Sequence, residues 1–169
     1  MHPQKIECRR VHAESGDQVV KVDGPEALKS LVGKEIGVSD WLAVTQTRID
    51  QFANATEDRQ WIHTQPERAK EESPYGATIA HGFLTLSLLS TFARQALEIA
   101  GVRLAVNYGL NRVRFPSAVR EGTRVRARIQ LVGARDVEGG GEATFVCMVE
   151  AEGADKPCCV AEWIVRYYL

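Results

Sequence analysis

The residues of this chain with the clearest capacity for acid–base chemistry lie in one short segment. Asp58 and His63 are five residues apart and precede an apolar stretch that begins near Ile79. A carboxylate and an imidazole can converge on one water molecule if the segment between them folds back between helix ends. Hydration of a conjugated double bond requires such a pair, because one group takes a proton from water and the other gives a proton to carbon. An imidazole with a pKa of about 6.5 can serve in this role at neutral pH.

Gly82 meets a third requirement of that reaction. Addition of water to a double bond beside a thioester carbonyl puts negative charge on the thioester oxygen. A backbone N–H in the first turn of a helix has no helical partner and can donate to this oxygen. The helix dipole favours the same charge. A glycine at this position would let the substrate approach the backbone closely.

Purely structural interpretations of these residues stay open. Asp58 could end a helix as a turn former, and His63 could cap the short helix that follows. His81 is expected to be a core histidine that is hydrogen-bonded to backbone. A metal site formed by Asp58, His63 and His81 is conceivable, but no metal-ligand spacing supports it, so we expect no metal.

Capping residues and apolar spacing predict the helices that would position this segment. Pro25 begins a short helix that stops at Gly33. Thr45 caps a second helix, over residues 46–56, whose apolar residues repeat at intervals of three and four. A further short helix is predicted over residues 66–72, again with a proline in its first turn. The longest helix is predicted over residues 79–100, with apolar residues on nearly every side, so other elements must wrap it.

Strand-like segments in the C-terminal part can supply that wrapping. They are predicted over residues 104–115, 123–132, 143–151 and 158–168, and turn residues separate them. Helices followed by antiparallel strands indicate an α+β fold, with a sheet curled around one long buried helix, the hot dog arrangement. We expect residues 1–24 to be an extension with at most one short strand at residues 19–22, and residues 25–169 to form a single domain.

Composition narrows the classes of partner and compartment. The chain is 44% hydrophobic and 25% charged with a formal net charge of -1, so neither nucleic acid nor a membrane is an expected partner. The first 23 residues contain no apolar block typical of a signal peptide, and we expect a cytoplasmic protein. The four cysteines fit no metal or disulfide pattern and are expected to be free thiols, at positions 8, 147, 158 and 159.

Two motifs resemble the MaoC-like dehydratases, which are (R)-specific enoyl-CoA hydratases of the hot dog superfamily. They are Phe52-Ala53-x-x-Thr56-x-Asp58-x-Gln60-Trp61-Ile62-His63 and Ile79-Ala80-His81-Gly82-Phe83-Leu84. The resemblance runs from about residue 38 to residue 168 and is strongest to the NodN-like branch, in which Gln-Trp replaces Asn-Pro. The segment from Asn107 to Pro116 is similar to that branch as well.

The resemblance implies roles for individual residues. Asp58 and His63 would bind and activate water, the Gly82 N–H would hold the thioester oxygen, and Ser90 and Gln60 would support the pair. The acyl chain would lie in a tunnel beside the central helix, and the protein would be a homodimer with its two sheets joined edge to edge. Trp61 departs from the usual proline and would reshape the acyl pocket.

The thiol carrier of the substrate would be coenzyme A or acyl carrier protein, with no separate cofactor. Arg112 and Arg114 are the first candidates for contact with coenzyme A phosphates. The other arginines of the local basic cluster alternate along one strand and are expected on a solvated face, at positions 124, 126 and 128.

Three functions are therefore weighed. The first is the reversible hydration of trans-2-enoyl thioesters to (R)-3-hydroxyacyl thioesters, a hydro-lyase reaction. The second is a hot dog thioesterase, which would use a carboxylate to activate water on the carbonyl carbon. The third is a non-catalytic acyl-thioester binding module, although a pure binder would not need Asp58 and His63.

Overall fold

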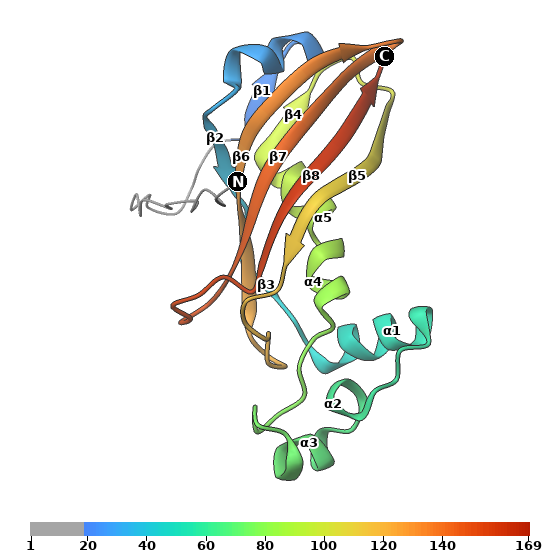
Figure 1. The fold of residues 1–169 in the computed structure, drawn as a ribbon, viewed down its shortest axis with the longest axis vertical. Coiled ribbons are helices and arrows are strands. Elements are labelled where there is room, and N and C mark those ends of the chain that lie inside the picture. The colour runs from blue at the N-terminus through green and yellow to red at the C-terminus, as the bar shows by residue number, and fades with distance from the viewer. Residues whose placement is uncertain (1–18) are drawn as a thin grey trace, which may run out of the picture.

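The computed structural model describes residues 19–169, which form an antiparallel sheet packed on a broken central helix (Figure 1). The sheet is six-stranded, with the order β2-β6-β7-β8-β5, and β3 pairs with β6 outside this path. Its strands are β2 (Glu35–Val38), β3 (Leu42–Ala43), β5 (Leu104–Arg114), β6 (Arg124–Val137), β7 (Gly140–Ala151) and β8 (Cys159–Tyr168). The α+β class and the hot dog arrangement predicted from the sequence are confirmed.

The central strands show why this sheet curls around a helix. Inward side chains on β6 alternate with outward ones, and the inward set is buried at Val125, Ala127, Ile129 and Leu131. The same alternation runs along β7 and β8. The inward faces of these strands join the core residues of the central helix in one hydrophobic cluster.

The central helix is shorter than predicted and is interrupted. It consists of α4 (Gly82–Ser87) and α5 (Leu89–Ala96), with a turn at Leu88. The prediction of one helix over residues 79–100 is wrong at both ends, for tertiary reasons. Ile79 forms a bridge with Arg120, so the chain is still extended there. After α5 the chain becomes β4 (Leu97–Ile99), because β1 (Val20–Val22) offers it a parallel partner.

The wrapping of this helix is also incomplete. Phe92 on α5 is fully buried against the sheet, whereas Phe83 on α4 is 70% exposed. An apolar residue left in solvent on a helix beside the edge of a sheet indicates a surface that another molecule could cover.

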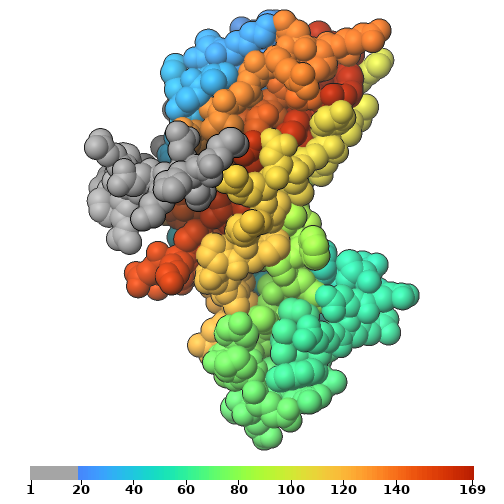
Figure 2. Space-filling view, in the orientation of Figure 1, coloured from blue at the N-terminus to red at the C-terminus, as the bar shows by residue number. Residues whose placement is uncertain are grey.

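Of the remaining described helices, three begin and end close to where the sequence predicts, whereas the short helix Trp61–Thr64 was not predicted. Thr45 caps α1 (Gln46–Thr56), since its side chain accepts a hydrogen bond from the Arg48 N–H. α2 (Trp61–Thr64) and α3 (Pro66–Glu72) follow, and η1 (Pro25–Leu31) is a 3₁₀ helix. Figure 2 shows α1, α2 and α3 as a lobe at one end of the molecule, beyond the sheet.

The structure also bears on the predictions for the N-terminal segment, the short strands and the cysteines. The short strand near residues 19–22 is observed as β1, whereas residues 1–18 lie outside the described residues and the proposed domain boundary stays a prediction. The strands β2, β3 and β4 were not predicted. Cys147, Cys158 and Cys159 are buried free thiols, and Cys8 lies outside the described residues. None of the described helices is long and apolar enough to span a membrane.

Candidate active site

The segment that carries Asp58 begins where α1 ends. Glu57 adopts the left-handed conformation, with φ of 61°, the single non-glycine residue of the described chain with positive φ. Such a residue stops a helix and reverses the chain direction. Asp58 therefore leaves the axis of α1 and enters a short loop that leads to α2, on which His63 lies.

His63 is held in one orientation by its surroundings. Its residue is 7% exposed, and its Nδ1 lies 2.6 Å from the Ile79 carbonyl oxygen. Because a carbonyl only accepts, Nδ1 carries the proton, and in the neutral ring Nε2 keeps a free lone pair. The Gln46 side chain on α1 donates to the His63 carbonyl at 2.8 Å. The ring thus presents an unprotonated nitrogen from a fixed position.

Burial favours that neutral form. Desolvation lowers the pKa of His63 below 6.5, and the hydrogen bond to Ile79 opposes this shift. The charge of His81 lowers the same pKa, and the charge of Asp58 raises it. With desolvation dominant, the imidazole is ready to accept a proton at neutral pH.

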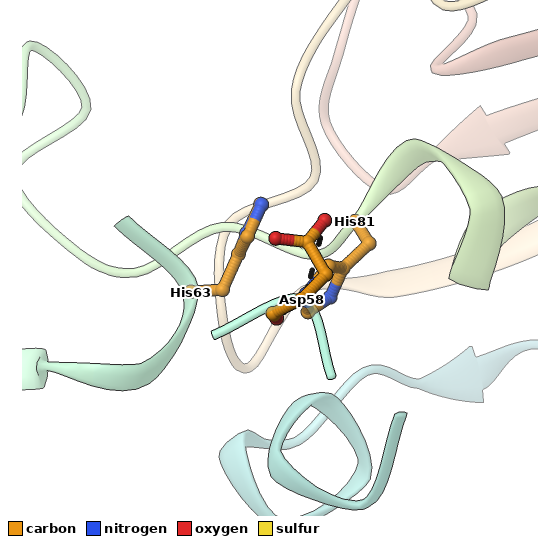
Figure 3. Close-up of side chains that lie close together, drawn as sticks. All are labelled: Asp58, His63 and His81. Carbon is orange, nitrogen blue, oxygen red and sulfur yellow. Dashed lines mark hydrogen bonds and ion pairs between the residues drawn. The ribbon is translucent and has the colours of Figure 1, made fainter. Parts of the chain in front are cut away.

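Asp58, His63 and His81 converge, as Figure 3 shows. One ligand-type atom of each residue lies within 4.8 Å of the others. The Asp58 side chain is 55% exposed and one of its carboxylate oxygens lies 4.0 Å from His81 Nε2. The predicted spatial convergence of Asp58 and His63 is therefore observed, whereas their chemical roles stay predictions.

His81 is the core histidine expected from the sequence. It is 3% exposed, and its Nε2 donates to the Asp58 carbonyl oxygen at 2.9 Å. With Nδ1 of His63 and Nε2 of His81 both directed at carbonyls, each ring has one nitrogen left. The absence of a metal stays a prediction.

Gly82 is the first residue of α4, so its N–H lies in the turn that has no helical acceptors. The structure adds a second reason for a glycine here, beside the expected close approach of the substrate, which stays a prediction. A Cβ at this position would lie 3.0 Å from the Phe115 ring, closer than ordinary contact. The glycine therefore leaves room for Phe115, and no local pattern predicts this contact because Phe115 is distant along the chain.

The two predicted supporting residues have different surroundings. Ser90 on α5 accepts a hydrogen bond from the Asn107 side chain at 3.5 Å. Gln60 begins α2 with its backbone, since its carbonyl accepts from the His63 N–H at 2.9 Å. In the structure, Gln60 therefore helps to position His63 through its backbone carbonyl.

Two cavities lie between the central helix and the strands β5 and β8. One has a volume of about 330 Å³ and extends to Leu97 and Tyr167. The other, about 470 Å³, begins at Phe52 and Phe83. Ser90, Asn107 and Trp163 line both cavities, so these two spaces adjoin. Sequence reasoning assigned no role to Asn107 or Trp163, which are brought to the cavities by β5 and β8.

The arginines divide into two sets. Arg126 and Arg128 pair with glutamates of neighbouring strands on the outer face, and Arg124 pairs with Glu152 just after β7, as expected for a solvated face. Arg112 and Arg114 lie exposed on the edge strand β5. Their contact with phosphates stays a prediction.

Trp61 contacts neither of the two cavities. Its ring lies under the Arg68 guanidinium, whose central carbon is 4.5 Å from the ring centroid. Neither cavity is lined by Trp61, so the expectation that it reshapes the acyl pocket gains no support from these contacts.

Two solved structures share this fold. A monoamine oxidase regulatory protein from Archaeoglobus fulgius is 25% identical, with a TM-score of 0.70 and coverage of 90% of this chain and 98% of that one. The R-hydratase PhaJ1 from Pseudomonas aeruginosa is 19% identical, with a TM-score of 0.68 and coverage of 86% and 85%. The second likeness concerns the fold alone.

Sequence similarity identifies the family. Residues 27–152 match the MaoC like domain, and the chain belongs to that family. It is 52% identical over 141 residues to 3-hydroxyacyl-thioester dehydratase Z of Mycobacterium tuberculosis, covering 83% of this chain and 93% of that protein. It is also 48% identical over 141 residues to nodulation protein N of Rhizobium leguminosarum bv. viciae, covering 80% and 85%. Both the MaoC-like and the NodN-like resemblances are thus confirmed.

Proposed function

We propose that this protein is a hydro-lyase that interconverts trans-2-enoyl thioesters and (R)-3-hydroxyacyl thioesters. The observation that carries the proposal is the convergence of Asp58 and a neutral, fixed His63 beside the first turn of α4. The similarity to a dehydratase of 3-hydroxyacyl thioesters supports it.

In the hydration direction, Asp58 and the free Nε2 of His63 hold one water molecule. An O–H bond of that water breaks as its proton passes to this pair, and its oxygen bonds to C3 of the substrate. The π electrons of the double bond move toward the thioester carbonyl, and the Gly82 N–H donates to its oxygen. A proton held by the pair then returns to C2, which completes the addition of water. Dehydration follows the same steps in reverse.

The substrate is a thioester of coenzyme A or of acyl carrier protein, and no separate cofactor takes part. The adjoining cavities beside α4 and α5 are lined by apolar and aromatic side chains together with a few polar ones, among them Ser90, Arg94 and Asn107, a mixture that suits an acyl chain bearing a polar group. Arg112 and Arg114 contact the phosphates of coenzyme A as charged donors. Nucleic acid is not a ligand, since the chain has a net charge of only -1.

The active form is a homodimer in the cytoplasm, with two copies of β5 adjoining. β5 is an edge strand of 11 residues, and an unpaired edge of that length favours pairing with another strand. Apolar side chains on it are exposed at Leu104, Val106, Tyr108 and Leu110. Phe83 and Phe115, which pack edge to face nearby, extend the same surface.

The test uses the purified full chain with trans-2-enoyl-CoA substrates of increasing length. Loss of the enoyl absorbance and formation of the (R)-3-hydroxyacyl product are expected. Release of free thiol from saturated acyl-CoA would instead indicate a thioesterase. Tight binding of every enoyl thioester without chemical change would indicate a binding module and refute the proposal.

A further inference from the structure

The His81 side chain contacts both members of the candidate pair. Its Nε2 donates to the Asp58 carbonyl oxygen at 2.9 Å. Its ring stacks on the His63 ring with centroids 3.7 Å apart and planes inclined by 27° (Figure 3). The Phe52 ring of α1 also packs against it, at 5.1 Å. One buried side chain therefore joins α1, the loop that carries Asp58, α2 and the start of α4.

The loop that carries Asp58 has little regular structure of its own. Residues 57–60 lie in neither a helix nor a strand. A hydrogen bond from the Arg59 N–H to the Glu57 carbonyl closes one tight turn, and the Thr64 hydroxyl donates to the Arg59 carbonyl. For the Asp58 carbonyl, the partner in the described chain is His81. This bond fixes Asp58 relative to α4, and hence relative to Gly82.

Packing alone does not account for a histidine at this position. Nδ1 of His81 is buried and has no hydrogen-bond partner among the described residues. A buried polar atom without a partner lowers stability, and an apolar side chain of similar size would avoid this loss. The histidine therefore needs another reason, and its contacts with Asp58 and His63 supply one.

We infer that His81 is a positioning residue, which holds the Asp58 backbone and the His63 ring in the relative orientation that hydration requires. This inference rests on the proposed function for its kinetic consequences. His81 lines neither cavity, so it acts through the pair and does not bind the acyl chain.

The pKa of His63 provides a second way to test this role of His81. The titratable groups acting on His63 are Asp58 from the loop and His81 from the start of α4. Asp50 on α1 reaches His63 only through Gln46, which donates to both Asp50 and the His63 carbonyl. Burial and the charge of His81 both lower the pKa of His63. Loss of the His81 ring removes both influences in part, so the pKa of His63 should rise.

Two substitutions separate the hydrogen bond from the stacked ring. His81→Phe keeps a ring against His63 but cannot donate to the Asp58 carbonyl. His81→Gln keeps an amide donor near the position of Nε2 but removes the ring. Both should lower kcat for hydration by about tenfold to a hundredfold with little change in KM, because misplacement of catalytic groups by about 1 Å has effects of this size. The acidic limb of the kcat/KM profile should move to higher pH, most in His81→Gln.

A control distinguishes positioning from general loss of stability. Ile129→Val removes a methyl group from the fully buried core of β6, and Ile129 lines neither cavity. It should lower the melting temperature while kcat stays at the wild-type value. If Ile129→Val loses as much activity as the His81 variants at an equal drop in melting temperature, the positioning role is refuted.

NMR of the imidazole rings tests the inference without substrate. In the wild-type protein the ¹⁵N shifts should place the proton of His81 on Nε2 and that of His63 on Nδ1, and the opposite tautomers would overturn the inference even if neither variant folds. In the folded variants the pKa of His63 should rise. An unchanged pKa together with wild-type kcat would also overturn it. A wild-type protein that hydrates no enoyl thioester would refute the proposed function alone, because these NMR results do not depend on turnover.

Discussion

Two groups of ionisable side chains in this protein differ in how their charges are satisfied. On β6 and its neighbours β7 and β2, Arg126 lies 3.0 Å from Glu150, and Arg128 lies 2.9 Å from Glu35. At the candidate site, the Asp58 carboxylate has no lysine or arginine partner in the described chain, and His63 keeps a free Nε2. Paired charges have little capacity left for a ligand, whereas the Asp58 carboxylate and the His63 ring remain available to bind water.

The ion pairs of the sheet and the residues of the candidate site also differ in what they contribute to stability. Exposed ion pairs contribute little, since solvent screens them and side-chain entropy opposes them. At the site, burial of His63 and the unpartnered Nδ1 of His81 both act against stability. Residues that lower stability are retained where they serve a function. Mutagenesis should therefore begin with the candidate site and not with the ion pairs of the sheet.

The largest expected effect comes from breaking the pair itself. Asp58→Asn and His63→Gln should each lower kcat for hydration by about 10²–10⁴-fold, as expected for loss of a general acid or base. Steady-state kinetics with an enoyl-CoA measures this, and melting temperatures check that each variant is folded. Activity within a few-fold of wild type in either variant would remove that residue from the mechanism.

Acidification should produce the next largest effect. Burial lowers the pKa of His63, so kcat/KM should fall with a midpoint below pH 6.5 as His63 takes up a proton. The unfolded chain binds this proton first as the pH falls below 6.5, so the free energy of unfolding should decrease over the same range. Rate profiles and urea unfolding at several pH values test both statements. A midpoint above pH 6.5 would contradict the assignment of His63 as a buried neutral base.

Arg112 and Arg114 also lie on the sheet but, unlike the arginines of β6, they have no glutamate partner among the described ion pairs. Replacing both with alanine should raise KM for an enoyl-CoA by about tenfold and leave kcat unchanged, since each exposed ion pair contributes up to about 1 kcal/mol and a tenfold change corresponds to about 1.4 kcal/mol. A short enoyl thioester without phosphates serves as the control and should show no change in KM. An equal change with both substrates would rule out phosphate recognition.

The smallest effect is expected on the outer face. Arg126→Ala should leave kcat and KM unchanged and lower the free energy of unfolding by less than about 1 kcal/mol, because its ion pair with Glu150 is partly exposed. Urea unfolding and steady-state kinetics measure these quantities. A marked rise in KM would mean that the paired arginines also contact the substrate.

Much of the fold could be predicted where local signals and tertiary packing agree. The Thr45 cap, the prolines that begin η1 and α3, and the alternation along β6 all led to elements observed in the structure. The prediction of one helix over residues 79–100 was wrong at both ends, where short apolar stretches fit a helix and a strand equally well. There the bridge of Ile79 with Arg120 and the pairing of β4 with β1 decided the outcome.

Residue type and spacing around a helix start are enough to identify the groups that could do chemistry, namely Asp58, His63 and Gly82. The orientation of these groups depends on contacts that form only in the folded chain. The Ile79 carbonyl sets the protonated nitrogen of His63, the His81 ring joins it to Asp58, and the Phe115 ring packs close to Gly82, where a Cβ would be crowded. These contacts join residues up to 33 positions apart, for which no local pattern exists.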